Sequence, residues 1–273
     1  MNPIQSILVH VDAGPHCSSR LRIARALGGQ HGASVTAVYA VTPAYVDLSL
    51  VFTAGLAVNS DLLDLDESRL AAARKLVADA CADPGVQIEW REAREAPERE
   101  FMRQALYADL LVLGQYQGNH HEIGVPADFA QWVVIASGKP ALVVPRTEMH
   151  QPNFDTALVA WKESREAARA LSAALPLLCK AGSVHVAVDS EVSDTHRALL
   201  KQFLQRHGVE PQFRALASPA AQAGNALLSM AADVGADLMV MGCYGHSRGR
   251  ELMLGGATRT IVNSMTVPVL MAH

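Results

Sequence analysis

The residues best suited to hold a ligand lie near the end of the chain, in the stretch MGCYGHSRGRELMLGGATRTI at residues 241–261. The stretch follows the short apolar run ADLMV, which has the residue types of a strand, and it leads into a segment that can continue as a helix over Thr258–Ser264. A strand, a glycine-rich loop and a helix start, in this order, commonly present backbone N–H groups to an anion. The pattern therefore predicts a phosphate-binding loop.

The glycines of this stretch have two expected tasks. The first ones allow a tight turn beside a ligand, because glycine reaches positive φ without steric cost. The last ones precede the final helix, whose free N–H groups and positive dipole end favour a phosphate by about 0.3–1 kcal/mol. The alternative is that the glycines only shape a strand-to-helix loop. The predicted ligand residues are Gly242, Gly245, His246, Gly255, Gly256, Ala257 and Thr258, with positive charge from Arg248 and Arg250.

An internal repeat indicates what must position this loop. The run ADLLVLG at Ala108–Gly114 matches ADLMVMG at Ala236–Gly242, and SILVHVD at Ser6–Asp12 has a counterpart in TALVAWK at Thr156–Lys162. The spacing is also kept, since 26 positions separate Gly114 from Pro140 and 26 separate Gly242 from Pro268. Two copies of one folding unit explain both matches.

Each copy alternates apolar strands with helices. The strands are apolar almost throughout, which is typical of a parallel sheet covered on both faces. We therefore expect an α/β protein of two tandem, five-stranded, parallel, doubly wound domains, at residues 1–146 and 156–273, with a polar linker at 147–155. Ser164 and the pair Ser218-Pro219 are predicted to begin two helices of the second domain. The expected strands are 7–11, 35–41, 86–91, 110–113 and 141–144, then 158–161, 184–188, 210–215, 238–241 and 269–271.

Composition limits the classes of partner. The chain has 273 residues, of which half are apolar and 18% are charged, so a globular protein is expected. Its net charge of −4 gives no reason to expect duplex nucleic acid or an anionic membrane as a partner. We find no apolar run of membrane-spanning length and no signal peptide, and the four cysteines form no CxxC pair. These features favour a cytoplasmic protein with reduced thiols.

The pattern Gly242-x2-Gly245-x9-Gly255, between ADLMVMG and VPVLM, resembles the nucleotide-binding signature of the universal stress protein family, and the repeat is similar to its tandem members. The resemblance implies an α/β fold of strand order 3-2-1-4-5. It also implies ATP as a ligand, with adenine near the ends of the first two strands, here at Trp161 and Val188, and the phosphates on the glycine loop. Family members are generally binding proteins rather than efficient enzymes.

The two copies depart from the family pattern in opposite ways. In the second copy Gly255 is followed by Gly256 where the family usually has a hydroxyl residue, and Trp161 is expected to replace the family's aspartate, which Asp12 matches in the first copy. The indole is expected either to stack on adenine or to fill its pocket. In the first copy an offset of 128 residues sets Gln117, Ala127 and Asp128 opposite Gly245, Gly255 and Gly256. A carboxylate there repels phosphate, so nucleotide is expected only in the second copy.

Two further segments have residue types that suggest a metal site or a contact surface. His120, His121 and Glu122 have metal-ligand residue types, but neighbouring side chains point in different directions and no fourth ligand is evident, so a solvated loop without metal is expected. The apolar stretch Pro43–Val58 is long for a connection between a strand and a helix. It is expected either to pack over the first copy or to form a partner surface.

The sequence thus predicts a nucleotide-binding module of the stress response, with an adenine nucleotide as ligand and no catalytic residue. The alternatives are a weak ATPase, which lacks an obvious water-positioning carboxylate in the loop, and a scaffold that has lost nucleotide binding. Strands 141–144 and 269–271 are expected to pair within the chain, since the family commonly joins domains through its fifth strand, and a homodimer is also expected.

Overall fold

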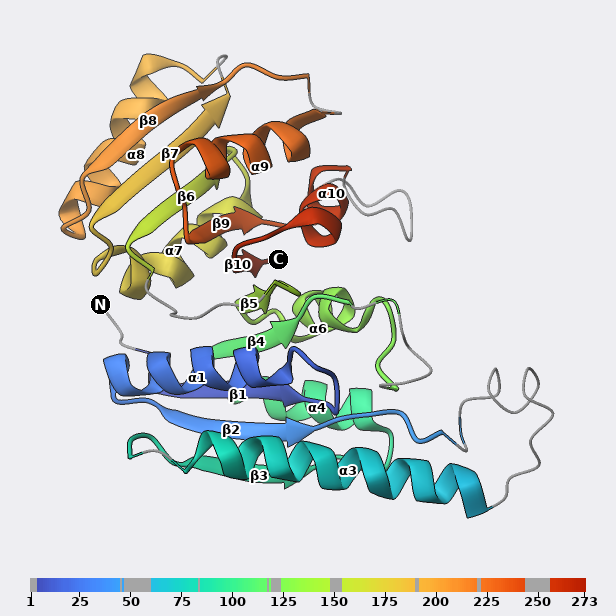
Figure 1. The fold of residues 1–273 in the computed structure, drawn as a ribbon. Coiled ribbons are helices and arrows are strands. Elements are labelled where there is room, and N and C mark those ends of the chain that lie inside the picture. Colours follow the sequence, from blue (N-terminus) through green and yellow to red (C-terminus); the bar gives the residue numbers. More distant parts are fainter. Residues whose placement is uncertain are drawn as a thin grey trace. The chain divides into compact units, whose positions relative to one another are not determined.

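The protein consists of two compact units in a computed structural model, one over Ile4–Lys139 and one over Pro140–His273 (Figure 1). The structure describes residues 4–44, 46, 60–82, 84–116, 118, 124–147, 154–189, 192–219, 222–243 and 256–273. Each unit is a mostly parallel sheet with helices on both faces, so the predicted α/β class is confirmed.

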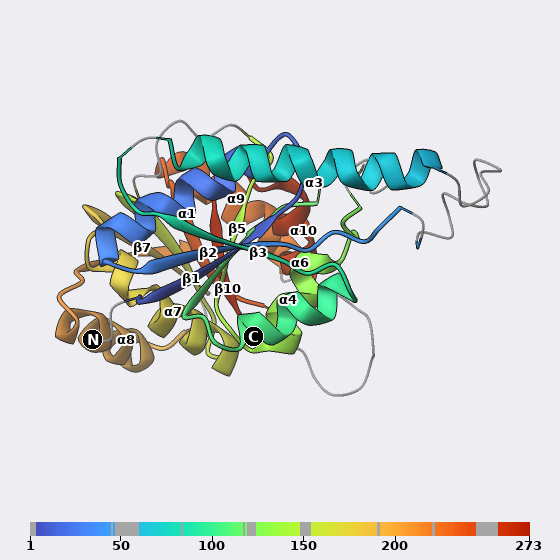
Figure 2. The same cartoon turned by 90° about the horizontal axis from the view of Figure 1, so that it is seen from below.

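The first unit contains four parallel strands in the order β3-β2-β1-β4. Helices α1 and α3 cover one face of the sheet, and α4 and α6 cover the other (Figures 1 and 2). The bounds are β1 Ser6–Val11, α1 Cys17–His31, β2 Ser34–Tyr39, α3 Ser60–Ala80, β3 Ile88–Glu92, α4 Pro97–Ala105, β4 Leu110–Gly114 and α6 Phe129–Ser137.

The strands of this unit form where the sequence is apolar without interruption. Five of the six residues of β1 are buried, and so are the first four of β4, because helices cover both faces of the sheet at these strands. Strand β3, with the sequence IEWRE, lies at the edge of the sheet and alternates half-buried with exposed residues. The interior strands were therefore the easier ones to predict.

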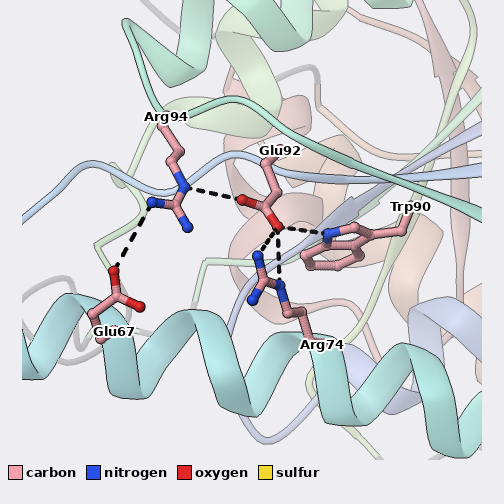
Figure 3. A network of polar contacts seen from close by, with 5 residues as sticks. All are labelled: Glu67, Arg74, Trp90, Glu92 and Arg94. Carbon is pink, nitrogen blue, oxygen red and sulfur yellow. Dashed lines mark hydrogen bonds and ion pairs between the residues drawn. The ribbon is translucent and has the colours of Figure 1, made fainter.

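A polar network connects the edge strand β3 to helix α3 (Figure 3). The carboxylate of Glu92 accepts hydrogen bonds from Arg74 Nε at 3.0 Å, Trp90 Nε1 at 2.9 Å and Arg94 Nε at 2.9 Å. Arg94 also lies 3.9 Å from Glu67 on α3. Burial raises the pKa of Glu92, but the three donors together lower it by more. The pKa of this carboxyl group is therefore below its usual range, and the group stays ionised at a lower pH than a free glutamate.

The second unit contains five parallel strands in the order β8-β7-β6-β9-β10. Numbered within this unit, the order is 3-2-1-4-5, as predicted. Helices α7 and α8 cover one face, and α9 and α10 cover the other (Figures 1 and 2). The bounds are β5 Ala141–Val144, β6 Thr156–Trp161, α7 Arg165–Leu178, β7 Ser183–Asp189, α8 Asp194–Arg206, β8 Pro211–Leu216, α9 Ala223–Asp233, β9 Leu238–Gly242, α10 Gly256–Ser264 and β10 Val269–Ala272.

The predicted pairing between the closing strands of the two copies is confirmed. Strand β5 pairs antiparallel with β10, with Leu142 opposite Leu270 and Val143 opposite Val269. By its contacts β5 belongs to the second unit, although the sequence repeat makes it the fifth strand of the first copy. Strand β10 is therefore paired on both edges, with β5 and with β9.

One of the two predicted helix starts is correct. Ser164 is the N-cap of α7, and its hydroxyl accepts a hydrogen bond from the Ala167 N–H at 3.2 Å. The prediction for Ser218-Pro219 is wrong, because α9 begins at Ala223 with Gln222 as its N-cap. The Ser218 hydroxyl instead lies 3.4 Å from the Pro219 carbonyl, so it is used locally and not by the helix.

Candidate functional site

A cavity of about 410 Å³ lies at the carboxyl ends of β6, β7 and β9 in the second unit. This is the place where doubly wound α/β folds bind ligands, because the order of the strands reverses there. The cavity is bounded by the first turns of α7 and α10, so two helix N-termini contribute to its wall. Its volume is within the range of small-molecule sites.

Five of the nine residues predicted from sequence line this one cavity, namely Trp161, Gly242, Gly256, Ala257 and Thr258. Val188 does not line it. Its side chain is fully buried, whereas its neighbours Ala187 and Asp189 on the same strand do face the cavity, since successive side chains of a strand point in opposite directions. Gly245, His246 and Gly255 lie outside the described residues, together with Arg248 and Arg250.

Helix α10 brings the last part of the glycine stretch to the cavity. Gly256, Ala257 and Thr258 form its first turn, and the N–H groups of a first turn have no acceptor within their own helix. Thr258 is buried, with 5% of its surface exposed. Among the residues that the structure describes, none has an atom within 4 Å of a Cβ added at Gly256. An anion placed at this helix end has room as well as donors.

Four charged side chains of the wall were missed by the prediction: Lys162, Glu163, Glu166 and Asp189. A hydrogen bond from its own backbone N–H and a further one from Ser164 hold the pKa of Glu166 below its usual range, so this buried carboxylate is ionised. Arg165 Nη2 lies 3.4 Å from Glu166 and offsets part of this charge. Asp189 ends the largely apolar strand β7, and this change from apolar to charged is the signal that could have identified it.

The register of the strands corrects one correspondence drawn from the sequence. Ile7 pairs with Leu110 in the first unit, and Ala157 pairs with Leu238 in the second. Since Leu110 and Leu238 occupy the same place in the repeat, Asp12 corresponds to Lys162 and not to Trp161. The alignment was wrong by one residue. Trp161 is the last residue of its strand and corresponds to Val11, which is buried.

In the first unit an arginine lies beside Gly114, the counterpart of Gly242. Gly114 ends β4 as Gly242 ends β9, and a Cβ at Gly114 meets the Arg20 guanidinium. Arg20 Nη2 lies 2.7 Å from Asp12 Oδ2, and Arg20 Nε donates to the His10 carbonyl at 3.0 Å. Both charged side chains are buried. The first unit therefore fills the space beside its Gly114 with its own ion pair.

Gly242 has a structural task that does not depend on any ligand. A Cβ at this position stands 2.3 Å from the Ala167 nitrogen and 2.5 Å from the Glu166 carbonyl carbon, so β9 contacts the backbone of α7 directly. We expect Gly242→Ala to lower the free energy of unfolding by about 1–3 kcal/mol, because helix and strand must move apart. Urea unfolding monitored by circular dichroism measures this loss.

Gly256→Ala is the matched control for that substitution. It adds the same methyl group at the other end of the glycine stretch, where no atom of the described part of the chain lies within 4 Å. We expect no loss of stability there, since alanine is the better helix former. Equal stabilities of the two variants and the unmodified protein contradict the close contact at Gly242.

The two segments with other candidate chemistry, His120–Glu122 and most of Pro43–Val58, lie outside the described residues. Among the residues that are described, no group of three or more His, Cys, Asp or Glu side chains is arranged to hold a metal ion. The described helices include none that is both long enough and apolar enough to cross a membrane.

Comparison with known proteins shows what parts of the chain are similar to. The model of the universal stress protein family matches residues 153–273, the half that carries the cavity. No curated protein matches the chain in sequence. A universal stress protein from Archaeoglobus fulgidus DSM 4304 is similar in structure with a TM-score of 0.70 at 17% identity, over 98% of this chain and 97% of that one. A protein of unknown function from Pseudomonas aeruginosa PAO1 is similar with a TM-score of 0.57 at 14% identity, over 98% of this chain and 92% of that one.

The A. fulgidus protein matches the chain along its full length, so the likeness in fold extends over both halves and is not confined to the half that the family model recognises. Residues 153–273 match the model of the universal stress protein family, so this part of the chain is a universal stress protein domain.

Proposed function

We propose that the second unit binds an adenine nucleotide, ATP or AMP, in the cavity at the ends of β6, β7 and β9, and that the protein serves the stress response as a nucleotide-dependent binding module. The main support is that five residues chosen from sequence, for a phosphate loop and an adenine pocket, line one cavity. Family membership of residues 153–273 adds to it.

In this proposal the phosphates lie against the first turn of α10. Gly256 and Ala257 supply backbone N–H groups there, and Thr258 supplies a hydroxyl. The base lies toward Trp161 and Ala187, on β6 and β7. Asp189 and Glu163 provide carboxylates that can accept hydrogen bonds from ribose hydroxyls or from the amino group of adenine.

Trp161 lines the cavity, and the volume of about 410 Å³ is present with the indole in place. Between the two roles considered for this residue, stacking on the base and filling the pocket, this favours stacking. A stacked base is expected to quench the emission of Trp161, which can be observed alone after Trp90→Phe and Trp132→Phe.

The experiment is a calorimetric titration of the protein with ATP and with AMP, repeated on Gly256→Asp. The new carboxylate lies beside the expected phosphates, and two like charges about 4 Å apart in a partly exposed site interact by several kcal/mol. We expect affinity to fall at least tenfold, which corresponds to about 1.4 kcal/mol. The fold itself is expected to remain, because no described residue crowds a side chain at Gly256 and an acidic residue is favourable at a helix N-terminus.

Gly256→Ser is the matched control, since it adds a side chain of similar size without charge. It is expected to bind at least as tightly as the unmodified protein, because the hydroxyl is a further donor to phosphate. Failure of the unmodified protein to bind ATP or AMP overturns the proposal in favour of a scaffold. Binding that survives Gly256→Asp unchanged overturns the location. Phosphate release proportional to protein concentration favours the ATPase alternative.

A further inference from the structure

A second cavity of the same unit, of about 430 Å³, lies next to the proposed nucleotide site. It lies between helices α7 and α8 and shares only Trp161 and Glu163 with the first cavity. Its other lining residues come from α7 and α8: Ala168, Leu171, Ser172, His196, Leu199, Leu200 and Phe203. We call it the α7–α8 groove.

The side chains of α8 form one apolar stripe along this groove. Leu199, Leu200 and Phe203 follow His196 at helical spacing, so all four lie on the same face of the helix. Leu200 is buried, but Leu199 is 59% exposed and Phe203 is 36% exposed. From α7, Leu171 is buried and Ala168 is small, so they leave room opposite the stripe. The groove thus presents apolar surface to solvent in a space large enough for a small molecule.

One end of the groove is polar. His196 Nδ1 lies 2.6 Å from Glu163 Oε1, and both residues line the groove. The carboxylate can only accept hydrogen bonds, and it repels an anionic group placed next to it. This acceptor suits an N–H or O–H donor and disfavours a carboxylate or a sulfonate.

We infer that the α7–α8 groove is a second ligand site, which takes an uncharged or cationic aromatic amine or alcohol of one to three rings. The rings lie between Leu199, Phe203 and Trp161, and the donor group faces Glu163 and His196. This site requires no nucleotide. Because Trp161 belongs to both cavities, its fluorescence reports occupancy of either one.

The test uses two fluorescent probes that differ by one charged group. N-phenyl-1-naphthylamine is uncharged, and 8-anilinonaphthalene-1-sulfonate has the same rings with a sulfonate. Titrated into nucleotide-free protein, the amine is expected to saturate at one site and to accept excitation energy from Trp161 in a protein whose other two tryptophans are phenylalanine. It is expected to bind at least tenfold more tightly than the sulfonate, and Glu163→Gln is expected to narrow this difference.

Two substitutions test the location. Ala168→Phe fills the groove from its exposed α7 side, and Leu199→Ser removes apolar surface from α8. Each is expected to weaken binding of the amine at least tenfold. Leu63→Ser is the matched control, since Leu63 is 52% exposed on α3 of the first unit, and it is expected to leave binding unchanged. Circular dichroism verifies that all variants fold.

Three results overturn the inference. The first is amine binding that is unaffected by both Ala168→Phe and Leu199→Ser. The second is equal affinity for the amine and the sulfonate, which removes the role of Glu163. The third is absence of amine binding, and a dimer that dissociates on Leu199→Ser then assigns the groove to contact with a second copy of the chain.

Discussion

Arg20→Met is expected to lower the free energy of unfolding of the first unit by about 3–5 kcal/mol, the usual result of removing one partner from a buried ion pair. Arg20 and Asp12 are 2% exposed each, and their charged groups lie 2.7 Å apart. Methionine keeps much of the length of the side chain but leaves the Asp12 carboxylate buried without a cation.

The same pair makes this loss depend on pH. Burial raises the pKa of Asp12, but the Arg20 guanidinium and further donors, including the Gly14 N–H at 2.8 Å, lower it by more. The folded state therefore holds this carboxylate ionised to a lower pH than the unfolded chain does. The resulting stabilisation is present above the ordinary pKa of aspartate and disappears as the pH falls through the lower, folded value.

Urea unfolding at pH 7 in a Trp161→Phe background measures the effect, because the remaining tryptophans, Trp90 and Trp132, report on the first unit only. The double variant Arg20→Met with Asp12→Leu is the control. It removes both charges, so it is expected to be more stable than Arg20→Met alone. A single variant that is as stable as the unmodified protein contradicts the importance of the pair.

Acidification from pH 6.5 to pH 4 is expected to destabilise the first unit through His10, by up to about 1.4 kcal/mol per pH unit and about 3 kcal/mol in total. His10 is 1% exposed and contacts the rings of Phe101 and Phe129. Its Nε2 lies 2.9 Å from the Ala40 carbonyl, so the neutral ring carries its proton on this nitrogen.

Burial lowers the pKa of His10 from 6.5 to about 4, and the nearby Asp12 carboxylate compensates only in part. Between these two values the unfolded chain binds a proton at His10 and the folded chain does not, so stability falls with falling pH and the slope disappears below about pH 4. Unfolding curves at several pH values in the Trp161→Phe background measure the slope. His10→Gln, which can still donate to the Ala40 carbonyl, is expected to flatten it. An equal slope in this variant assigns the acid sensitivity to other groups.

The strands could be predicted from the sequence because a buried parallel strand requires only a short, continuous apolar run, which is a local property. Runs such as Leu110–Gly114 and Leu238–Gly242 are apolar, short and repeated, and each became a buried parallel strand. The start of α9 was predicted wrongly because Ser218-Pro219 has the residue types of a cap, while the actual start at Ala223 carries no side-chain cap. Cap chemistry identifies a helix end only where the helix uses it, as α7 does with Ser164.

The sequence predicted the location of the candidate site better than it predicted the residues that line the cavity. Glycines and a threonine before a last helix identified the α10 end of the cavity. The register of β7 decides to which face of the sheet each side chain of Ala187, Val188 and Asp189 points. A shift of one residue reverses all three. Arg20 was not foreseen in the first unit, because its place beside Gly114 depends on packing between a helix and a strand more than 90 residues apart.

The antiparallel partnership of β5 with β10 has a consequence for how copies of this protein can associate. An unpaired outer strand acts as a template on which another chain can add a strand, and this leads to strand exchange or to fibres. Strand β10 has backbone partners on both sides, so an incoming chain finds no unused hydrogen-bonding edge on it. Assembly by continuous strand addition at β10 requires β5 to be displaced first, and a dimer of the folded chain must use other surfaces.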